Sequence, residues 1–413
     1  MNRVIKVYLK RGKENSIRRY HPWIFSGAVD DNKTRKQAPD YEMFNGEIAE
    51  VYSASDEFLG IGHFSIGTIM VRILSFEKRE INSAFWVEAI GKALKVREKI
   101  LLTASPDTNC YRLVHGEGDN LPGLIIDIYN QTAVIQPHTL GMEKSLEDIS
   151  SALLQLLGDK IKAIYCKGTA NSKSETISEI PDGYLKKSDK KDEDSDCNIV
   201  RENGIDFYID WEKGQKTGFF LDQRENRERV KQYAKDRKVL NLFCYTGGFS
   251  LYALKGGAQF VDSVDSSAFA IESVIKNLTL NKFSYGKKYG ENRAICTDAI
   301  DFLRELPKNN YDLMIVDPPA FAKHLSAKRN ALRAYKNLNA LAIEKIERGG
   351  LIFTFSCSQV VDKYDFALAV FSAAAQADRR VRILGRLTQP EDHPVNIYHP
   401  EGEYLKGLLL YVE

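Results

Sequence analysis

Glycines and acidic residues follow three apolar runs in the C-terminal half of the sequence, at the points where buried strands are expected to end. The run VLNLF (239–243) leads into Gly247 and Gly248. The next run ends at Asp265 and a third ends at Asp298. Glycine lets the chain turn sharply and approach a ligand closely, and a carboxylate at the second strand end can bind ribose hydroxyls. Each acid could instead cap the following helix, an equal alternative for Asp298, but the series favours a cofactor that carries a nucleoside.

Two further groups that could do chemistry follow the next two strands. Asp317 begins the run Asp-Pro-Pro-Ala-Phe, and Cys357 lies in Ser-Cys-Ser after GLIFTF. A thiolate can form a covalent intermediate, and a carboxylate can accept a hydrogen bond from a group on which charge develops. The alternative for Cys357 is a small buried thiol, but the neighbouring Asp-Pro-Pro turn favours a nucleophile. Cys244, under the glycine turn, and Cys296, within a strand, are the competing thiols.

The elements that must position these groups form an alternating series. Apolar runs such as KVLNLF, QFVDSVD, YDLMIVD and GLIFTFS alternate with helical segments. This alternation predicts an α/β fold with a doubly wound, mainly parallel sheet covered on both faces. The sequence has neither a GxxxxGK[ST] phosphate loop nor a strict GxGxxG turn, which argues against a P-loop nucleotide site and disfavours a nicotinamide dinucleotide.

The rest of the chain reads as two smaller domains. Short strands with turn signals predict a small β-barrel or sandwich over residues 1–75. A helix is expected over 81–101, capped by Asn82 or Ser83, and residues 76–210 mix strands with helices. NIVRENGIDFYIDW predicts a hairpin with its turn at Asn203-Gly204, and KKSDKKDEDSD (186–196) a solvated loop. We therefore expect domains at 1–75, 76–210 and 211–413.

Composition narrows the class of protein. The formal net charge is +2, but residues 1–40 carry a local excess of basic residues, typical of a nucleic-acid surface or of a solvated edge. The six cysteines are scattered without a CxxC pair, which argues against disulfides and zinc. His393-Pro394 and His399-Pro400 are interpreted as structural turns, because no cluster of cysteine, histidine or carboxylate residues is expected around them, and no metal is expected. Since no apolar run could span a bilayer and no secretory signal is present, we expect a cytoplasmic protein without membrane contact.

Several segments carry a resemblance to a known family. They are HPWIFSGAV (21–29), GQKTGFFLDQREN (214–226), LNLFCYTGGFS (240–250), VDSS (264–267), DPPAFAK (317–323), SCS (356–358) and PEGEYLKGLLL (400–410). The sequence resembles class I S-adenosylmethionine-dependent methyltransferases, and more closely the large-subunit ribosomal RNA 5-methylcytosine methyltransferases with an N-terminal PUA domain. The resemblance covers nearly the whole chain. It implies a PUA-like RNA-binding domain, a mixed α/β connecting domain and a Rossmann-like catalytic domain, with S-adenosyl-L-methionine as cofactor and large-subunit rRNA as partner.

The resemblance also implies site residues. The cofactor would be bound by Phe219, Asp222, Arg224, Asn241, Phe243, Thr246, Gly247, Asp265, Ser266, Asp298, Ala299 and Asp317. The substrate would be bound by Pro318, Pro319, Phe321 and Lys323, and the catalytic residues would be Cys357 and Asp317. Among these, the residue pattern alone indicates roles for Gly247 and Asp265 and suggests one for Asp298. A homodimer is a further expectation.

Cysteine chemistry suits methylation of cytosine C5, which is too weak a nucleophile to accept a methyl group directly. Attack of the Cys357 thiolate on C6 would make C5 enamine-like, while Asp317 binds the exocyclic amine or a protonated N3. Lys323 or an arginine could favour the thiolate. The target must be unpaired or flipped out, and Phe321 and Tyr335 are candidates to stack on it, with core packing an equal alternative for Tyr335.

Two alternatives stay open. In some RNA 5-methylcytosine enzymes the motif corresponding to DPPAF carries a second cysteine for product release, and here that position is apolar. Asp-Pro-Pro-aromatic is also typical of amine methyltransferases, which need no thiol, so an rRNA amine or guanine-N7 methyltransferase is the first alternative. The second is a non-catalytic RNA-binding assembly factor.

Overall fold

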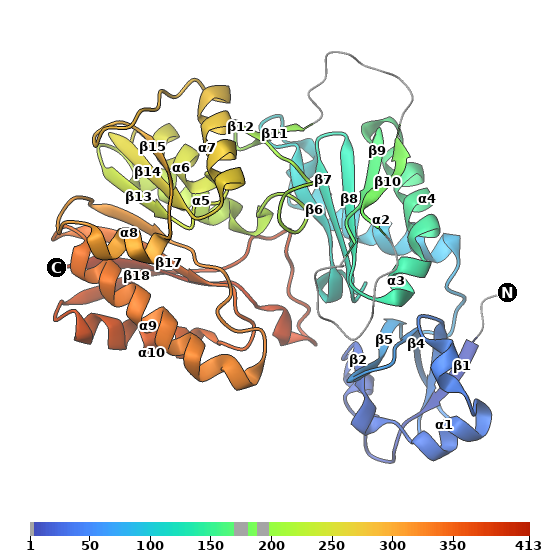
Figure 1. Ribbon diagram of the computed structural model, residues 1–413. Helices are drawn as coiled ribbons and strands as arrows, with labels where there is room; N and C mark the ends of the chain where they lie inside the picture. The colour runs from blue at the N-terminus through green and yellow to red at the C-terminus, as the bar shows by residue number, and fades with distance from the viewer. Residues whose placement is uncertain (1–3, 169–180, 188–197) are drawn as a thin grey trace. The chain divides into compact units, whose positions relative to one another are not determined.

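The computed structural model describes residues 4–168, 181–187 and 198–413. Contacts divide the chain into two compact units (Figure 1). The first comprises Met1–Arg201, Ile209–Phe219 and Glu391–Gly402, and the second Glu202–Tyr208, Phe220–Pro390 and Glu403–Glu413. The solvated loop predicted over 186–196 lies outside the described residues, apart from Lys186 and Lys187, which end a strand.

A five-stranded sheet forms the N-terminal part of the first unit. Its strands run in the order β1 (Val4–Tyr8), β3 (Ile48–Tyr52), β4 (Phe58–Phe64), β5 (Ile69–Ser75) and β2 (Trp23–Phe25). The four longer strands confirm the sequence prediction. The sequence did not indicate β2, which is too short to show alternation, or the polar helix α1 (Asp31–Gln37). Helix α1 is held by Thr34, a buried residue whose hydroxyl accepts a hydrogen bond from the Tyr8 amide at 3.2 Å.

A second five-stranded sheet follows in the same unit. Its order is β10 (Gly183–Lys187), β9 (Ala163–Cys166), β8 (Thr132–Pro137), β7 (Leu124–Tyr129) and β6 (Cys110–His115). The helices of this part are α2 (Ser83–Lys99), α3 (Leu140–Lys144) and α4 (Leu146–Leu157), whose apolar residues pack into one core with the sheet. Asn82 accepts a hydrogen bond from the Phe85 amide at 3.1 Å, so Asn82 rather than Ser83 caps α2.

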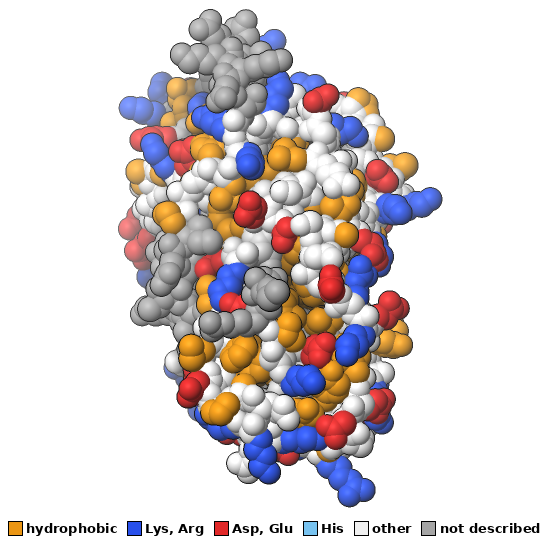
Figure 2. Space-filling view, turned by 90° about the vertical axis from the view of Figure 1, so that its right-hand side faces the viewer, with side chains coloured by type: hydrophobic (Ala, Val, Ile, Leu, Met, Phe, Trp, Pro, Cys, Tyr) orange, Lys and Arg blue, Asp and Glu red, His pale blue; other side chains and the backbone are white. Residues whose placement is uncertain are grey.

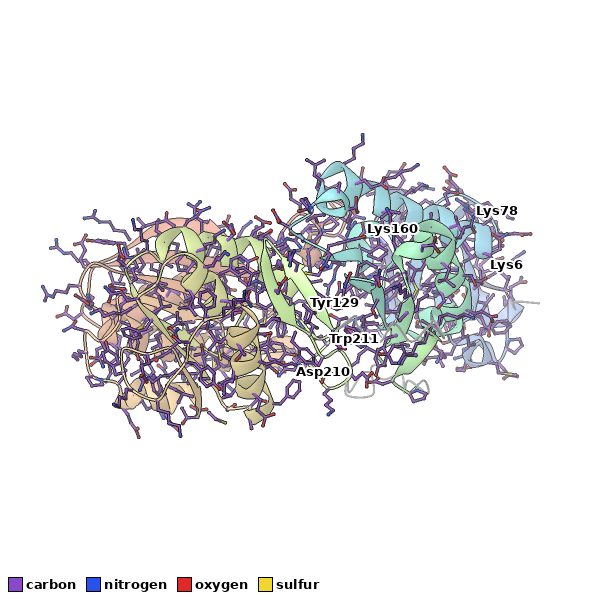
Figure 3. The ribbon with its side chains drawn as sticks, turned by 90° about the horizontal axis from the view of Figure 1, so that it is seen from above. Lys6, Lys78, Tyr129, Lys160, Asp210 and Trp211 are labelled. Carbon is purple, nitrogen blue, oxygen red and sulfur yellow. The ribbon has the colours of Figure 1, made fainter. Side chains whose placement is uncertain are left out.

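Two later segments join the first unit through buried contacts. Trp211 stacks on Tyr129 of β7 with ring centroids 6.3 Å apart (Figure 3). Arg97 of α2 is fully buried, pairs with Asp119 and donates to the carbonyl oxygen of Asp392 at 2.8 Å. Through these contacts, residues 209–219 and 391–402 belong to the first unit. The limits of the three domains expected from the sequence stay a prediction.

The second unit contains a seven-stranded sheet that confirms the predicted doubly wound class. Its order is β15 (Arg293–Cys296), β14 (Phe260–Asp265), β13 (Lys238–Leu242), β16 (Leu313–Val316), β17 (Gly350–Ser356), β19 (Lys406–Val412) and β18 (Val381–Leu387). The first five strands are parallel, and β19 is antiparallel to both of its neighbours. The strand order reverses direction at β13, where this class of sheet binds its ligands.

Helices cover both faces of this sheet (Figure 1). One face carries α5 (Arg224–Tyr233), α6 (Gly248–Lys255) and α7 (Ala268–Leu280), and the other α8 (Ala299–Glu305), α9 (Lys328–Lys345) and α10 (Lys363–Gln376). The predicted hairpin is also present as β11 (Ile199–Glu202) and β12 (Ile205–Tyr208), with positive φ angles of 48° at Asn203 and 72° at Gly204. Within the described ranges, no helix is both long and apolar enough to traverse a bilayer.

Candidate active site

The carboxyl ends of β13, β14, β15, β16 and β17 meet at one edge of the seven-stranded sheet, because these strands are parallel and adjacent. The residues that follow them are therefore neighbours along this edge. They are the turn 243–247, Asp265, Asp298, Asp317 and Cys357. The structure thus brings together the strand-end groups that the sequence singled out.

The turn after β13 has an unusual backbone. Phe243 and Tyr245 have φ angles of 57° and 47°, and Gly247 has 84°. Such angles are rare for bulky residues and persist only where surrounding contacts enforce them. Asp265 accepts a hydrogen bond from the Tyr245 amide at 2.9 Å, and Asn277 of α7 donates to the carbonyl oxygen of Thr246 at 3.0 Å. These bonds hold the turn in shape at the edge of the sheet.

Asn241 lies beneath this turn and is 1% exposed. Its amide donates to the Ser250 hydroxyl at 2.9 Å, and that hydroxyl lies 2.7 Å from the hydroxyl of Ser263. Its carbonyl oxygen Oδ1 is buried and has no hydrogen-bond partner among the described residues. A buried acceptor of this kind is costly unless a donor reaches it, so Asn241 presents an acceptor for a ligand bound at the turn.

The acids after β14 and β15 are anchored differently. One oxygen of Asp265 accepts from Tyr245, as above, and the other from the Ser267 amide at 2.9 Å. Because each carboxylate oxygen has two lone pairs, both retain capacity for a ribose hydroxyl. Asp298 is exposed and caps α8, accepting from the amides of Ile300 and Asp301. The capping alternative for Asp298 is therefore real, although its second oxygen is left for a ligand.

Two further predicted cofactor residues flank these acids. Ser266 is exposed beside Asp265, and Ala299 is buried as the first residue of α8. Their assignment to the cofactor stays a prediction.

The segment before α5 reaches the same edge through its polar side chains. Asp222 is 6% exposed and accepts from the Tyr404 hydroxyl at 2.7 Å. Gln223 donates to a carboxylate oxygen of Asp317 at 3.0 Å and accepts from Asn226 at 2.6 Å. Sequence reasoning missed Gln223, although it lies inside the LDQREN motif. Its amide fixes the orientation of Asp317.

The other two residues predicted in this segment, Arg224 and Phe219, belong to different units. Arg224 is the first residue of α5 and is 2% exposed. Phe219 is buried but belongs to the first unit, where its carbonyl accepts from the Tyr129 hydroxyl at 3.3 Å. A cofactor contact of Phe219 therefore stays a prediction from the resemblance.

The loop after β16 presents the predicted substrate residues at different depths. Pro318 is buried, Phe321 is half-buried, and Pro319 and Lys323 are exposed. Phe321 packs against Tyr335 of α9 with ring centroids 4.7 Å apart. Tyr335 itself is fully buried, so its proposal as a stacking platform is wrong and the core alternative holds. Phe321 is the aromatic ring that remains partly accessible there.

Cys357 is half-buried and follows β17, where Ser356 is paired with Lys406 of β19. Lys406 is 6% exposed, and its ammonium group donates to the carbonyl oxygens of Ser358 at 2.6 Å and Tyr404 at 2.7 Å. Burial lowers the pKa of Lys406 to about 8, and negative charge at Cys357 opposes that shift. A cation is therefore built in beside the thiol, at a position that sequence reasoning missed.

Ser358 connects the thiol loop to the substrate loop. Its hydroxyl accepts from the Ala322 amide at 3.4 Å and lies 3.0 Å from the Tyr335 hydroxyl. Its carbonyl binds Lys406, as above. The loops that carry Cys357 and Phe321 are thus cross-linked by hydrogen bonds, which fixes the thiol relative to the Asp-Pro-Pro turn.

The competing thiols have other environments. Cys244 is buried under the glycine turn, and burial raises its pKa well above the usual value for a thiol. Burial likewise raises the pKa of Cys166 to about 12. Cys296 is exposed at the end of β15. Only a thiolate is a competent nucleophile, so the buried pair is disfavoured and Cys357 is the thiol with a buried cation nearby.

The basic excess of residues 1–40 is partly neutralised. Arg18 pairs with Glu57 and Lys33 with Asp56, and Arg35 binds two acids. On the face shown in Figure 2, basic and acidic side chains are interspersed. The other basic residues that are exposed in this region are Lys6, Lys10, Arg11, Lys13, Arg19 and Lys36.

The structure also corrects the interpretation of His399. The sequence indicated no cysteine, histidine or carboxylate cluster around it, and that expectation is wrong. His21 and Glu401 lie close to His399, with one ligand atom from each residue within 4.8 Å of the others. His21 is distant in sequence, so local spacing could not show the cluster.

Comparison with known proteins places this geometry in a family. A model described as S-adenosylmethionine-dependent methyltransferase matches residues 188–400, and one described as PUA-like domain matches residues 7–76. Ribosomal RNA large subunit methyltransferase I from Tolumonas auensis is 39% identical over 409 residues, covering 98% of each chain. The protein of that name from Vibrio campbellii is 37% identical over 406 residues, covering 97% of this chain and 98% of its own.

Solved structures agree with the fold. A methyltransferase structure in complex with SAH has a TM-score of 0.81 at 22% identity, covering 98% of this chain and 100% of its own. The matched family model gives S-adenosyl-L-methionine as the cofactor. With a family model over half of its length and relatives along nearly all of it, the chain belongs to the S-adenosylmethionine-dependent methyltransferases, within the family of ribosomal RNA large subunit methyltransferase I.

Proposed function

We propose that this protein methylates C5 of a cytosine in large-subunit ribosomal RNA through a covalent bond between Cys357 and C6. The observation that carries the proposal is the half-buried Cys357 at the end of β17, which pairs on one side with β16, the strand before Asp317, and on the other with β19, which carries the buried Lys406. The rRNA substrate follows from the names of the relatives. The choice of cytosine rests on the resemblance and on the chemistry of the thiol.

The cofactor site would extend along the edge of the sheet. The proposed residues are Asp222, Arg224, Asn241, Phe243, Thr246, Gly247, Asp265, Ser266, Asp298, Ala299 and Asp317. Phe219, which belongs to the first unit, is included from the resemblance alone. The buried Oδ1 of Asn241 suits a donor on the methionine portion, and Asp265 suits the ribose hydroxyls. Asp298 with Ala299 would meet the adenine.

Each residue of the reactive centre has one proposed task. The Cys357 thiolate adds to C6, which places electron density on C5. Bound S-adenosyl-L-methionine would supply the electrophilic methyl group, with a C5–methyl bond formed as the sulfonium–methyl bond is broken. Loss of the C5 proton to a base then re-forms the ring double bond and expels the thiolate. Lys406 stabilises the thiolate before attack and after release.

Asp317 would bind the edge of the ring on which charge develops. Gln223 occupies one of its oxygens and leaves the carboxylate oriented, so that it can accept a hydrogen bond from the exocyclic amine or a protonated N3. Pro318, Pro319, Phe321 and Lys323 would line the substrate side. Phe321 can stack on a flipped base, which offsets part of the few kcal/mol that base flipping costs.

RNA binding would use the PUA-like domain. The exposed basic residues near the N-terminus, Lys6 among them (Figure 3), can contact backbone phosphates, and affinity should then fall with rising salt. The three-domain division at 1–75, 76–210 and 211–413, a homodimer and a cytoplasmic location belong to the same proposal, since they rest on the sequence and the resemblance.

The test is an RNA of the target sequence carrying 5-fluorocytosine, which cannot lose a proton from C5. We expect it to trap a covalent complex with the wild-type protein and with Cys296→Ala, which removes an exposed thiol outside the proposed centre, but not with Cys357→Ala. If the wild-type protein methylates the unmodified RNA but forms no covalent complex with the 5-fluorocytosine RNA, the amine or guanine-N7 alternative is favoured. No methylation of any ribosomal RNA or assembling subunit would favour a non-catalytic assembly factor.

A further inference from the structure

Three side chains with metal-binding atoms converge in the first unit. His21 precedes β2, while His399 and Glu401 lie in the segment Glu391–Gly402. Nε2 of His21 is 4.0 Å from one carboxylate oxygen of Glu401, and Nε2 of His399 is 3.9 Å from the other. The carboxylate therefore lies between the two imidazoles.

His399 indicates that the cluster is built for a ligand. It is 3% exposed, and neither of its ring nitrogens has a hydrogen-bond partner among the described residues. In its neutral form the imidazole offers one lone pair and one N–H donor. A buried polar group without a partner costs free energy, and an ion bound at Nε2 would satisfy one of the two ring nitrogens.

The imidazole of His21 and the indole of Trp23, which packs beside the cluster, are oriented by neighbouring groups. Nδ1 of His21 lies 3.3 Å from the carbonyl oxygen of Trp23 and 3.2 Å from the Trp23 amide, which donates to it. An ion at Nε2 would select the tautomer in which Nδ1 donates to that carbonyl instead. Trp23 donates through its indole N–H to Glu117 at 2.9 Å and packs against His399 with ring centroids 4.3 Å apart. The indole thus supports both histidines.

We propose that His21, His399 and Glu401 bind one divalent cation of the zinc class. Two imidazoles and one carboxylate are a recognised zinc ligand set, with water in the fourth position. Tetrahedral bonds of roughly 2.0–2.1 Å place ligand atoms about 3.4 Å apart. The separations of 4.0 and 3.9 Å from the imidazoles to the carboxylate must therefore shorten by about half an ångström, and the three ligand atoms, now within 4.8 Å of one another, must draw together around the ion. The ion would fasten the segment Glu391–Gly402 to the start of β2, a structural role independent of methyl transfer.

The test is zinc content of the untagged full-length protein after incubation with Zn²⁺ and removal of free ion. Glu401→Gln removes one ligand at an exposed position, and Glu403→Gln is the matched control, since it removes an exposed carboxylate from the same turn. We expect one bound zinc in the wild type and in Glu403→Gln. Loss of an outer partner alone weakens zinc binding about 10- to 100-fold, so Glu401→Gln and His399→Ala should weaken it at least tenfold.

Cofactor binding by each variant checks that it is folded, and Co²⁺ gives a spectroscopic readout of imidazole and carboxylate ligation. Zinc held equally by wild type and His399→Ala, or a cobalt spectrum typical of thiolate ligands, would assign the ion to cysteines and overturn the proposal. The absence of bound zinc in the wild type would overturn it as well.

Discussion

The edge of the seven-stranded sheet and the His21–His399–Glu401 cluster are built in opposite ways. At the sheet edge, each functional side chain directly follows its own strand, and the parallel order of the strands brings them together. In the cluster, the ligands come from opposite ends of the chain and meet through tertiary packing. A site of the first kind leaves a motif in the sequence, whereas a site of the second kind does not.

The largest effect is expected at the sheet edge. Cys357→Ala should lower methylation by at least about 10³-fold, because loss of a covalent nucleophile removes the reaction path itself. Cofactor affinity should be unchanged, as the cofactor residues lie on other strands. Single-turnover methylation and calorimetric binding of S-adenosylmethionine measure the two quantities. Retained turnover would contradict a covalent mechanism.

Lys406 should have the next largest effect. Lys406→Met removes the cation beside Cys357, and a thiol whose pKa rises by 1–2 units has about 10- to 100-fold less thiolate at neutral pH. The pKa of Lys406 is lowered to about 8, so its charge is present below that pH and lost above it. We therefore expect the advantage of the wild type over Lys406→Met in methylation rate to be fully present below about pH 8 and to shrink as pH rises through it.

The pH dependence of iodoacetamide labelling at Cys357 checks this prediction without RNA. In Lys406→Met the labelling profile should move to higher pH, while Lys323→Met, which removes an exposed lysine, should leave it in place. The reverse result would assign the thiol's activation to Lys323. Because labelling does not require methyl transfer, it separates a failure of this assignment from a failure of the proposed reaction.

A smaller effect is expected at Gln223. Gln223→Leu removes a hydrogen bond to a carboxylate, which contributes about 1.5 kcal/mol or more, so we expect roughly a tenfold lower rate with cofactor affinity retained. Asp317→Asn provides the comparison, because it removes the charge itself and should cost more. Equal losses in the two variants would mean that Gln223 does more than orient Asp317.

The smallest effect should come from the histidine cluster. Chelation with EDTA should lower the melting temperature of the wild type by a few degrees and leave Glu401→Gln unaffected. Methyl transfer by the remaining folded protein should not change. Differential scanning fluorimetry and the methylation assay, run on the same samples, show whether the two regions are independent.

Sequence reasoning succeeded where a residue's role depends on its place after a strand. Gly247, Asp265 and Asp317 follow strands with clear apolar patterns, and the parallel sheet follows from the alternation of elements. It failed where a residue's role depends on whether its side chain is buried in the folded protein. In the sequence, Tyr335 cannot be distinguished from an exposed ring that stacks on a base, but in the structure it is fully buried. In the sequence, Lys406 has no feature that distinguishes it from a surface lysine. Its position beside Cys357 depends on the pairing of β19 with β17.

The turn after β13 also sets limits on how this sequence can change. Phe243 and Tyr245 both have left-handed backbone angles, which only glycine, and to a lesser degree asparagine, adopts without cost. β-branched replacements at these positions would be selected against whatever their effect on the cofactor, whereas glycine would relieve the strain and loosen the turn. The identity of these two aromatic residues is therefore a compromise between backbone strain and the packing that opposes it, for instance Tyr245 against Phe220.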